Sequence, residues 1–190
     1  KEIGQSTHKY HEARGALPVE PDQLIEGEPA GTRLSWRVYL LPFLGQQQLF
    51  DQFHLAEPWD SEHNRTLLDQ MPAVYSIPDV KTAGHTPIVR FVGEGAFDGQ
   101  RRVRYRDIKD GTSNTIFCVV LGPDQAVPWT KPEDAVFNPD DPTSAFGEMP
   151  SKLFWALLLD GTPRAVKLTV DPNDIRRLIH HTDGEKIGSF

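Results

Sequence analysis

The chain has 190 residues, of which 38% are hydrophobic and 25% charged, and its formal net charge is −7. This composition is typical of one soluble globular domain that is long enough to bury a hydrophobic core. The negative charge argues against a nucleic-acid partner, because binding to phosphates requires clustered Lys and Arg. No run of residues approaches the ~20 apolar residues that are needed to span a bilayer.

The first 14 residues have apolar or small side chains at roughly helical spacing. These are Ile3, Thr7, Tyr10 and Ala13. Gly15 is typical of the residue that ends a helix, and Pro18 follows soon after. No N-cap residue precedes this helix, and the chain starts without Met. We therefore interpret residues 1–15 as the C-terminal half of a longer N-terminal helix.

Residues 34–64 form the most distinctive segment, with two tryptophans and three phenylalanines. Apolar side chains at helical spacing predict a helix over residues 34–53, which is disturbed at Pro42 and Gly45. A short second helix is expected to start at the Asp-Ser pair of residues 60–61, because both side chains are good helix caps.

From residue 74 onward, short β-branched or aromatic runs between Gly, Pro and Asp turns predict strands. The predicted strands are 88–92, 103–107, 115–121, 152–159 and 164–168. Asp110-Gly111 and Asp160-Gly161 are predicted to be hairpin turns.

Residues 124–150 are rich in proline, and we interpret them as a long surface excursion packed by its own aromatic residues, including Trp129. Asp171 and Pro172 predict the start of a last helix. Together these elements predict one α+β domain over residues 1–190. In it, the N-terminal helix packs on an antiparallel β-sheet that has helical insertions.

Several motifs along the chain are distinctive. They are Ile3-Gly4, Tyr10-His11, Ser35-Trp36-Arg37, Phe50-Asp51-Gln52-Phe53, Pro58-Trp59-Asp60-Ser61-Glu62-His63-Asn64, Asp110-Gly111-Thr112-Ser113-Asn114-Thr115, Asp160-Gly161 and Thr182-Asp183-Gly184-Glu185. Together they resemble a large planctomycete family of cell-envelope proteins of unknown function with prepilin-type N-termini. Pro150 departs from the pattern of that family, which has a histidine there.

The resemblance implies a pilin-like fold, similar to type II secretion pseudopilins. In such proteins a hydrophobic N-terminal helix is anchored in the inner membrane and polymerises, and a β-sheet head faces the periplasmic or extracellular side. We accordingly expect a non-enzymatic subunit of an envelope fibre or secretion apparatus. Its expected partners are other pilin-like subunits or the secretion machinery, with membrane contact only through the N-terminal helix.

A second hypothesis is a membrane-anchored extracellular module that binds polysaccharide or a small solute. It is motivated by the tryptophans, since aromatic faces stack on sugar rings. Two of them, Trp36 and Trp59, are expected to serve the core instead, whereas Trp129 and Trp155 have no such assignment. A hydrolase has no supporting motif, because no Ser-His-Asp or Cys-His grouping has a recognisable flanking sequence. No catalytic residue is predicted.

Asp110, Asp160 and Asp183 are the candidate ligands of a calcium ion. Asp110 opens a turn rich in carboxylate, hydroxyl and amide oxygens, and Ca²⁺ prefers oxygen ligands. An EF-hand is excluded because Leu121 stands where that loop would need Glu. The resemblance to pseudopilins implies calcium in a loop near the C-terminus, which is the region of Asp160 and Asp183. Turn hydrogen bonding also accounts for these residues.

Other groups have both a chemical and a structural interpretation. His8 and His11 lie three residues apart on the first helix and could share a metal, although packing is the favoured interpretation. The segment 59–64 could bind a cation or sugar hydroxyls, or form a capped helix start. His180-His181 are expected to favour the end of the last helix by charge. Cys118 lies in an apolar run and is predicted to be buried rather than nucleophilic.

Overall fold

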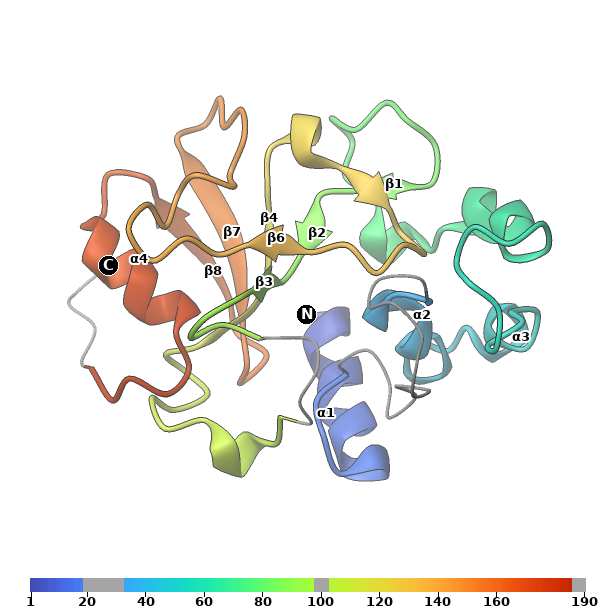
Figure 1. Ribbon diagram of the computed structural model, residues 1–190, viewed down its shortest axis with the longest axis horizontal. Coiled ribbons are helices and arrows are strands. Elements are labelled where there is room, and N and C mark those ends of the chain that lie inside the picture. The colour runs from blue at the N-terminus through green and yellow to red at the C-terminus, as the bar shows by residue number, and fades with distance from the viewer. Residues whose placement is uncertain (19–32, 98–102, 186–190) are drawn as a thin grey trace.

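A four-stranded β-sheet lies at the centre of the protein, and helices α1 and α4 pack on it (Figure 1). The computed structural model describes residues 1–18, 33–97 and 103–185. The sheet has the order β2 (Ile88–Val89), β4 (Ile116–Val120), β7 (Leu153–Leu158) and β8 (Pro163–Lys167), and the two helices are α1 (Glu2–Arg14) and α4 (Pro172–Ile179). The fold is therefore of the predicted α+β class.

Short helical turns and two-stranded ladders surround this centre. The helical turns are α2 (Trp36–Tyr39), η1 (Leu41–Leu44), α3 (Gln47–Phe50), η2 (Asn64–Gln70), η3 (Ala73–Tyr75), η4 (Tyr105–Asp107) and η5 (Pro123–Gln125). The ladders are β1 (His85–Thr86) with β5 (Val127–Pro128), which is antiparallel, and β3 (Phe91–Val92) with β6 (Ala135–Val136), which is parallel. Within the described ranges, none of the helices is long and apolar enough to cross a membrane.

Strands β4, β7 and β8 form antiparallel pairs, and residues along each strand alternate between the two faces of the sheet. Phe154, Ala156 and Leu158 of β7 belong to a core shared with α4, whereas Leu157 belongs to a core shared with α1. The turn Asp160-Gly161 joins β7 to β8, as predicted. Each face of the sheet thus supports one helix.

Helix α1 ends as its sequence predicts, and it lies against the turn between β7 and β8. Gly15 adopts a left-handed conformation with φ of 71° and donates its N–H to His11 O at 2.8 Å. Near the other end, Ile3 is buried. A Cβ atom on Gly4 would lie 2.8 Å from Gly161 Cα, so the close approach of helix and turn requires glycine.

The predicted helix over residues 34–53 is broken into three short turns. Helix α2 ends at Tyr39, Pro42 falls in the following 3₁₀ turn, and Gly45 ends that turn with φ of 75°. Pro42 lacks the N–H that a continuous helix would use, and the left-handed conformation of Gly45 redirects the chain. Pro42 and Gly45, which predicted a disturbed helix, therefore prevent a continuous one.

The prediction of a strand over residues 103–107 is wrong. These residues lead into the 3₁₀ turn η4, in which Asp107 Oδ2 accepts a hydrogen bond from Arg104 N at 3.0 Å. This local side-chain contact competes with the extended conformation that alternating arginines suggest. Because the described element directly before it is the 3₁₀ turn η4 and not a strand, Asp110-Gly111 does not form a hairpin turn.

The helix expected from residues 60–61 is the 3₁₀-helix η2, and its first residue organises the preceding loop. Ser61 Oγ accepts a hydrogen bond from Asn64 N at 3.0 Å. The Asn64 side chain is fully buried; its Oδ1 accepts from His54 N at 2.9 Å, and its Nδ2 donates to Pro58 O at 3.0 Å. The side chain of Asn64 therefore holds the backbone of the preceding loop against the start of η2.

The proline-rich segment 124–150 contributes to the core as well as to the surface. Its strands β5 and β6 pair with β1 and β3. Trp129 is fully buried, stacks on Tyr75 with ring centroids 6.1 Å apart, and meets Phe53 edge-on at 5.7 Å. These partners belong to another part of the chain, so the segment is not packed by its own aromatic residues alone.

A group of charged side chains is buried at the junction of α2, β2 and β6. Arg37 and Arg90 are 0% and 1% exposed, and the side chain of Asp134 is 5% exposed. Arg37 Nη2 donates to Asp134 Oδ1 at 3.2 Å, and Arg90 Nε donates to Oδ2 at 2.9 Å. Trp36 Nε1 donates to the same carboxylate at 3.2 Å. One buried carboxylate thus joins three side chains.

Polar groups of nearby residues in the same chain also bind the Arg37 guanidinium group. Its Nε and Nη2 donate to Ile88 O at 2.8 and 2.6 Å, and its Nη1 donates to Ser35 Oγ at 2.7 Å. Burial lowers the pKa of Arg37, and the nearby Asp134 carboxylate acts in the opposite direction. Because a buried charge is costly unless it is paired and hydrogen-bonded, removing Asp134 should be more damaging than removing an exposed acid.

Replacing Asp134 with Ala should lower the free energy of unfolding by about 3–5 kcal/mol, since two buried guanidinium groups lose a carboxylate partner. The adjacent Glu133 offers a matched control, because its pair with Lys131 is solvent-exposed. Glu133→Ala should cost less than about 1 kcal/mol. Urea unfolding followed by circular dichroism measures both changes. Equal losses for the two variants would contradict the structural role of Asp134.

Candidate metal centre

The C-terminal segment that follows helix α4 lies against the loop that precedes β4. The helix starts where Asp171 Oδ1 accepts a hydrogen bond from Asn173 N at 2.9 Å, with Pro172 in its first turn, as predicted. Ile175 and Leu178 are fully buried against the sheet core. The helix ends at Ile179, and the residues after it are therefore held close to the sheet.

Asp110, which lies in the loop before β4, accepts hydrogen bonds from this C-terminal segment. Its Oδ2 accepts a hydrogen bond from Asp183 N at 3.2 Å, and its Oδ1 accepts one from Gly184 N at 2.5 Å. Nearby, Lys109 N donates to His181 O at 3.0 Å. Three hydrogen bonds thus join two segments that are more than 70 residues apart in the chain.

Asp110, His180 and Asp183 converge at this junction. A potential ligand atom from each residue lies within 4.8 Å of the others, and no other such group of three or more His, Cys, Asp or Glu occurs in the described residues. His180 Nδ1 and Asp183 Oδ2 are 3.7 Å apart. The Asp183 side chain is 16% exposed, and its Oδ2 atom is buried without a hydrogen-bond donor from the described part of the chain.

The ring of His180 is wedged against the backbone of Gly95. A Cβ atom at Gly95 would lie 2.0 Å from His180 Cδ2 and 2.2 Å from Nε2, so a residue with a side chain would displace the ring. Gly95 also has a φ of 82°, which favours glycine. The opposite edge of the ring carries Nδ1, which accepts from Thr182 N at 3.3 Å and faces Asp183.

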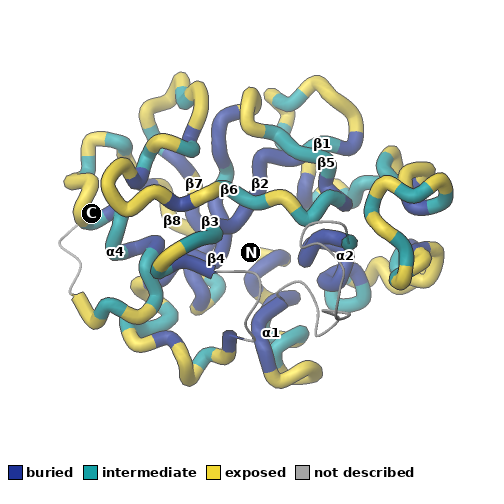
Figure 2. Tube along the Cα trace, in the orientation of Figure 1, coloured by how far each residue is buried: buried dark blue, intermediate teal, exposed yellow. Residues whose placement is uncertain are grey.

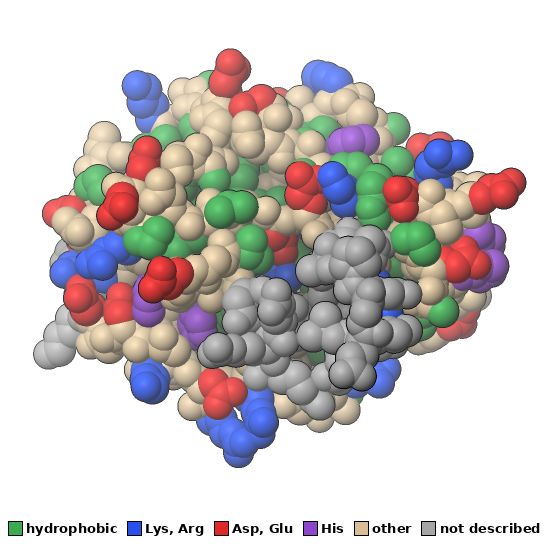
Figure 3. Space-filling view, in the orientation of Figure 1, with side chains coloured by type: hydrophobic (Ala, Val, Ile, Leu, Met, Phe, Trp, Pro, Cys, Tyr) green, Lys and Arg blue, Asp and Glu red, His purple; other side chains and the backbone are tan. Residues whose placement is uncertain are grey.

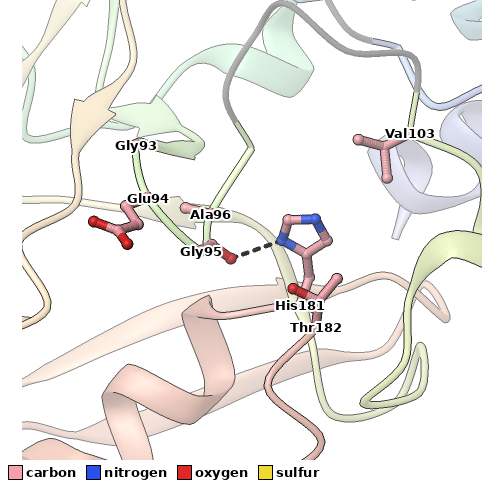
Figure 4. A pocket seen from close by; sticks show the side chains of 7 residues that line it. All are labelled: Gly93, Glu94, Gly95, Ala96, Val103, His181 and Thr182. Carbon is pink, nitrogen blue, oxygen red and sulfur yellow. Dashed lines mark hydrogen bonds between the residues drawn. The ribbon is translucent and has the colours of Figure 1, made fainter.

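A cavity of about 360 Å³ lies beside this cluster, lined by Gly93, Glu94, Gly95, Ala96, Val103, His181 and Thr182. Figure 4 shows the His181 ring between the glycine turn and Val103. His181 Nδ1 lies 2.7 Å from Gly95 O, and the ring stacks on Phe97 with centroids 5.4 Å apart. Because a carbonyl oxygen only accepts hydrogen bonds, Nδ1 is the donor in this contact.

The structure brings together two of the three aspartates that the sequence analysis selected. Asp110 and Asp183 belong to the cluster, whereas Asp160 is exposed in the β7–β8 turn, where its Oδ1 accepts from Thr162 N at 2.8 Å. His180 was not selected as a ligand. The sequence feature that could have indicated it is Asp183, which lies three residues after His180 and is followed by Gly184.

The donor set of this cluster does not suit the calcium ion that the resemblance implies. Ca²⁺ takes six to eight oxygen ligands. The cluster instead combines a ring nitrogen of His180 with the carboxylates of Asp110 and Asp183. Nitrogen and carboxylate ligands together are typical of zinc and related transition metals.

The two histidines of α1 pack against a tyrosine. The rings of His8 and His11 lie 5.0 and 4.3 Å from that of Tyr105, and His11 Nε2 accepts from Tyr105 N at 3.3 Å. Burial lowers the pKa of His11, and the charge of His8 acts in the same direction. The packing interpretation is thus favoured for this pair, although the contact is with η4.

Cys118 lies on β4 and is 3% exposed. Burial raises the pKa of its thiol to about 12. Since the thiolate is the nucleophilic form, the thiol is unreactive near neutral pH. The predicted assignment as a buried side chain therefore holds.

Alkylation by iodoacetamide at pH 8 should label Cys118 at least about 100-fold more slowly in the folded protein than in urea, because burial lowers both access and the thiolate fraction. The chain has one cysteine, so mass spectrometry of the intact protein follows the reaction without ambiguity. Similar rates in both states would show that the thiol is accessible and contradict its burial.

Comparison with known proteins finds one family. The family described as "Protein of unknown function (DUF1559)" matches residues 1–190. No curated protein matches the chain, and no solved structure does. The family match extends over the distinctive 34–64 segment, the Asp110 loop and the C-terminal cluster alike. The chain therefore belongs to the DUF1559 family of proteins of unknown function.

Proposed function

We propose that the protein is a non-enzymatic, pilin-like head domain in a fibre or secretion apparatus of the bacterial cell envelope. In this proposal the head lies on the periplasmic or extracellular face, and a helical segment upstream of α1 anchors it in the inner membrane. Its partners are other pilin-like subunits or the secretion machinery. The packing of α1 on the sheet is the observation that carries the proposal.

One side of α1 is committed to the head, and the other side is available for contacts. Gly4 approaches the backbone of Gly161, and Ser6 Oγ donates to Phe43 O at 3.0 Å. The outward side contains the exposed polar residues Gln5, Lys9 and Glu12. Figure 2 shows this division between buried and exposed parts of α1. A helix held in this way can present its free side to a neighbouring subunit without unfolding the head.

The surface chemistry is compatible with protein partners. On the face drawn in Figure 3, acidic and basic side chains are interspersed. The chain has 27 Asp and Glu against 20 Lys and Arg, so its overall field disfavours polyanions. The proposal therefore includes no nucleic-acid partner.

The protein produced in its own host from the natural gene, with the natural N-terminus and processing, should assemble into fibres or envelope complexes that electron microscopy detects. Lys9→Glu should reduce assembly while leaving the unfolding midpoint of the head unchanged, because Lys9 is exposed on α1. Gly4→Ala should instead destabilise the head itself, because its Cβ would meet Gly161. A correctly processed protein that remains monomeric would contradict the proposal.

A second function, the binding of polysaccharide by an anchored module, has one specific observation in its favour. Trp155 on β7 is 53% exposed, whereas Trp36 and Trp129 are fully buried and cannot stack on a sugar. The register pairs Trp155 with Val120 on one side and Ala165 on the other. A shallow, mostly apolar groove of about 120 Å³ lies beside it. A half-exposed indole on such a surface can stack on a sugar ring.

Calorimetric titration with envelope polysaccharides tests this second function. Trp155→Ala should abolish any binding, and Trp59→Ala, which removes a half-buried indole elsewhere, should not. Absence of binding tighter than millimolar with the unmodified protein would reject it.

A further inference from the structure

The cluster at the end of α4 points to a metal other than calcium. We propose that Asp110, His180 and Asp183 bind a divalent transition-metal ion, for which Zn²⁺ is the appropriate probe. The ion would join the Asp110 loop to the C-terminal segment. This proposal does not depend on the function proposed above, because it rests on the cluster alone.

The separations in the cluster are slightly wider than those around a small ion bound by three side chains. Ligand atoms around tetrahedral Zn²⁺ lie about 2.0–2.2 Å from the ion, and hence roughly 3.4 Å from one another. His180 Nδ1 and Asp183 Oδ2 are already 3.7 Å apart, and all three residues offer an atom within 4.8 Å. Water would occupy the fourth position, as it does in zinc sites with three protein ligands.

Acceptor atoms face each other in this cluster. His180 Nδ1 accepts a long hydrogen bond of 3.3 Å from Thr182 N. Asp183 Oδ2 lies opposite it, buried and without a donor among the described residues. A divalent ion between the two atoms would be coordinated by both. A metal ion would replace the long Thr182 bond and satisfy both atoms.

The candidate ligands are held in place before any ion binds. Gly95 fixes the ring of His180 so that its Nδ1 edge faces Asp183. Asp110 is fixed by the N–H groups of Asp183 and Gly184, which leaves further lone pairs on its oxygens. Such outer contacts orient metal ligands and reduce the ordering that binding requires.

The charges around the cluster favour a cation. The end of α4 directs the negative end of its helix dipole toward His180. The arginines of the same helix have acidic partners elsewhere: Arg176 Nη2 lies 3.6 Å from Glu185, and Arg177 Nε lies 2.7 Å from it. These arginines are thus paired with Glu185. The carboxylates of the candidate ligands Asp110 and Asp183 carry negative charge that a divalent ion would neutralise.

Isothermal titration of the chelator-treated protein with ZnCl₂ tests the proposal. One ion per chain should bind, and Asp183→Asn and His180→Gln should each weaken the affinity by at least about 10-fold, the lower limit for losing even an outer contact of a metal. Circular dichroism of each variant establishes that it is folded. Titration with CaCl₂ should give weaker binding than with ZnCl₂.

Two matched variants separate this site from other sites for zinc. Asp160→Asn removes an aspartate with the same turn contact, Oδ1 to the N–H two residues on, and should leave the affinity unchanged. His63→Gln removes one ring of the exposed His54–His63 stack and should also have no effect. The proposal is overturned by a lack of binding, by tighter binding of calcium, or by binding that survives Asp183→Asn but not His63→Gln.

Discussion

The buried carboxylate of Asp134 is the constraint on which the arrangement of the fold depends. It accepts hydrogen bonds from Arg37, Arg90 and Trp36, which reach it from different segments of the chain. Charged groups this deeply buried are stable only in one geometry, because each loss of contact leaves a charge without a partner.

The same network lies one short strand away from the turn that contacts the candidate metal centre. Arg90 stands between β2 and β3, and its carbonyl oxygen accepts a hydrogen bond from Ala135 N at 2.9 Å. Strand β3 then leads directly into the turn that contains Gly95, against which His180 rests. One short strand, β3, therefore separates the buried ion pair from the turn that contacts the candidate ligand His180.

Spacing, caps and turns in the sequence predicted those helix ends and strands that depend on residues close together in the chain. The end of α1 at Gly15, the start of α4 after Asp171 and the central strands follow from spacing, caps and turns. The strand over residues 103–107 was wrong because a side-chain contact of Asp107 outweighed the alternation. The site was half predicted: Asp110 and Asp183 were selected, but the place of His180 depends on a contact with a glycine 85 residues away in the chain. Distant contacts of this kind have no signature in spacing.

The DUF1559 family match establishes kinship, and the structure adds a chemical hypothesis that can be tested directly. The most direct measurement is anomalous X-ray diffraction at the zinc absorption edge, from crystals of the protein grown with ZnCl₂. We expect one strong peak within bonding distance of Asp110, His180 and Asp183. A peak only at other histidines, or no peak at all, would contradict the assignment of this cluster as a metal site.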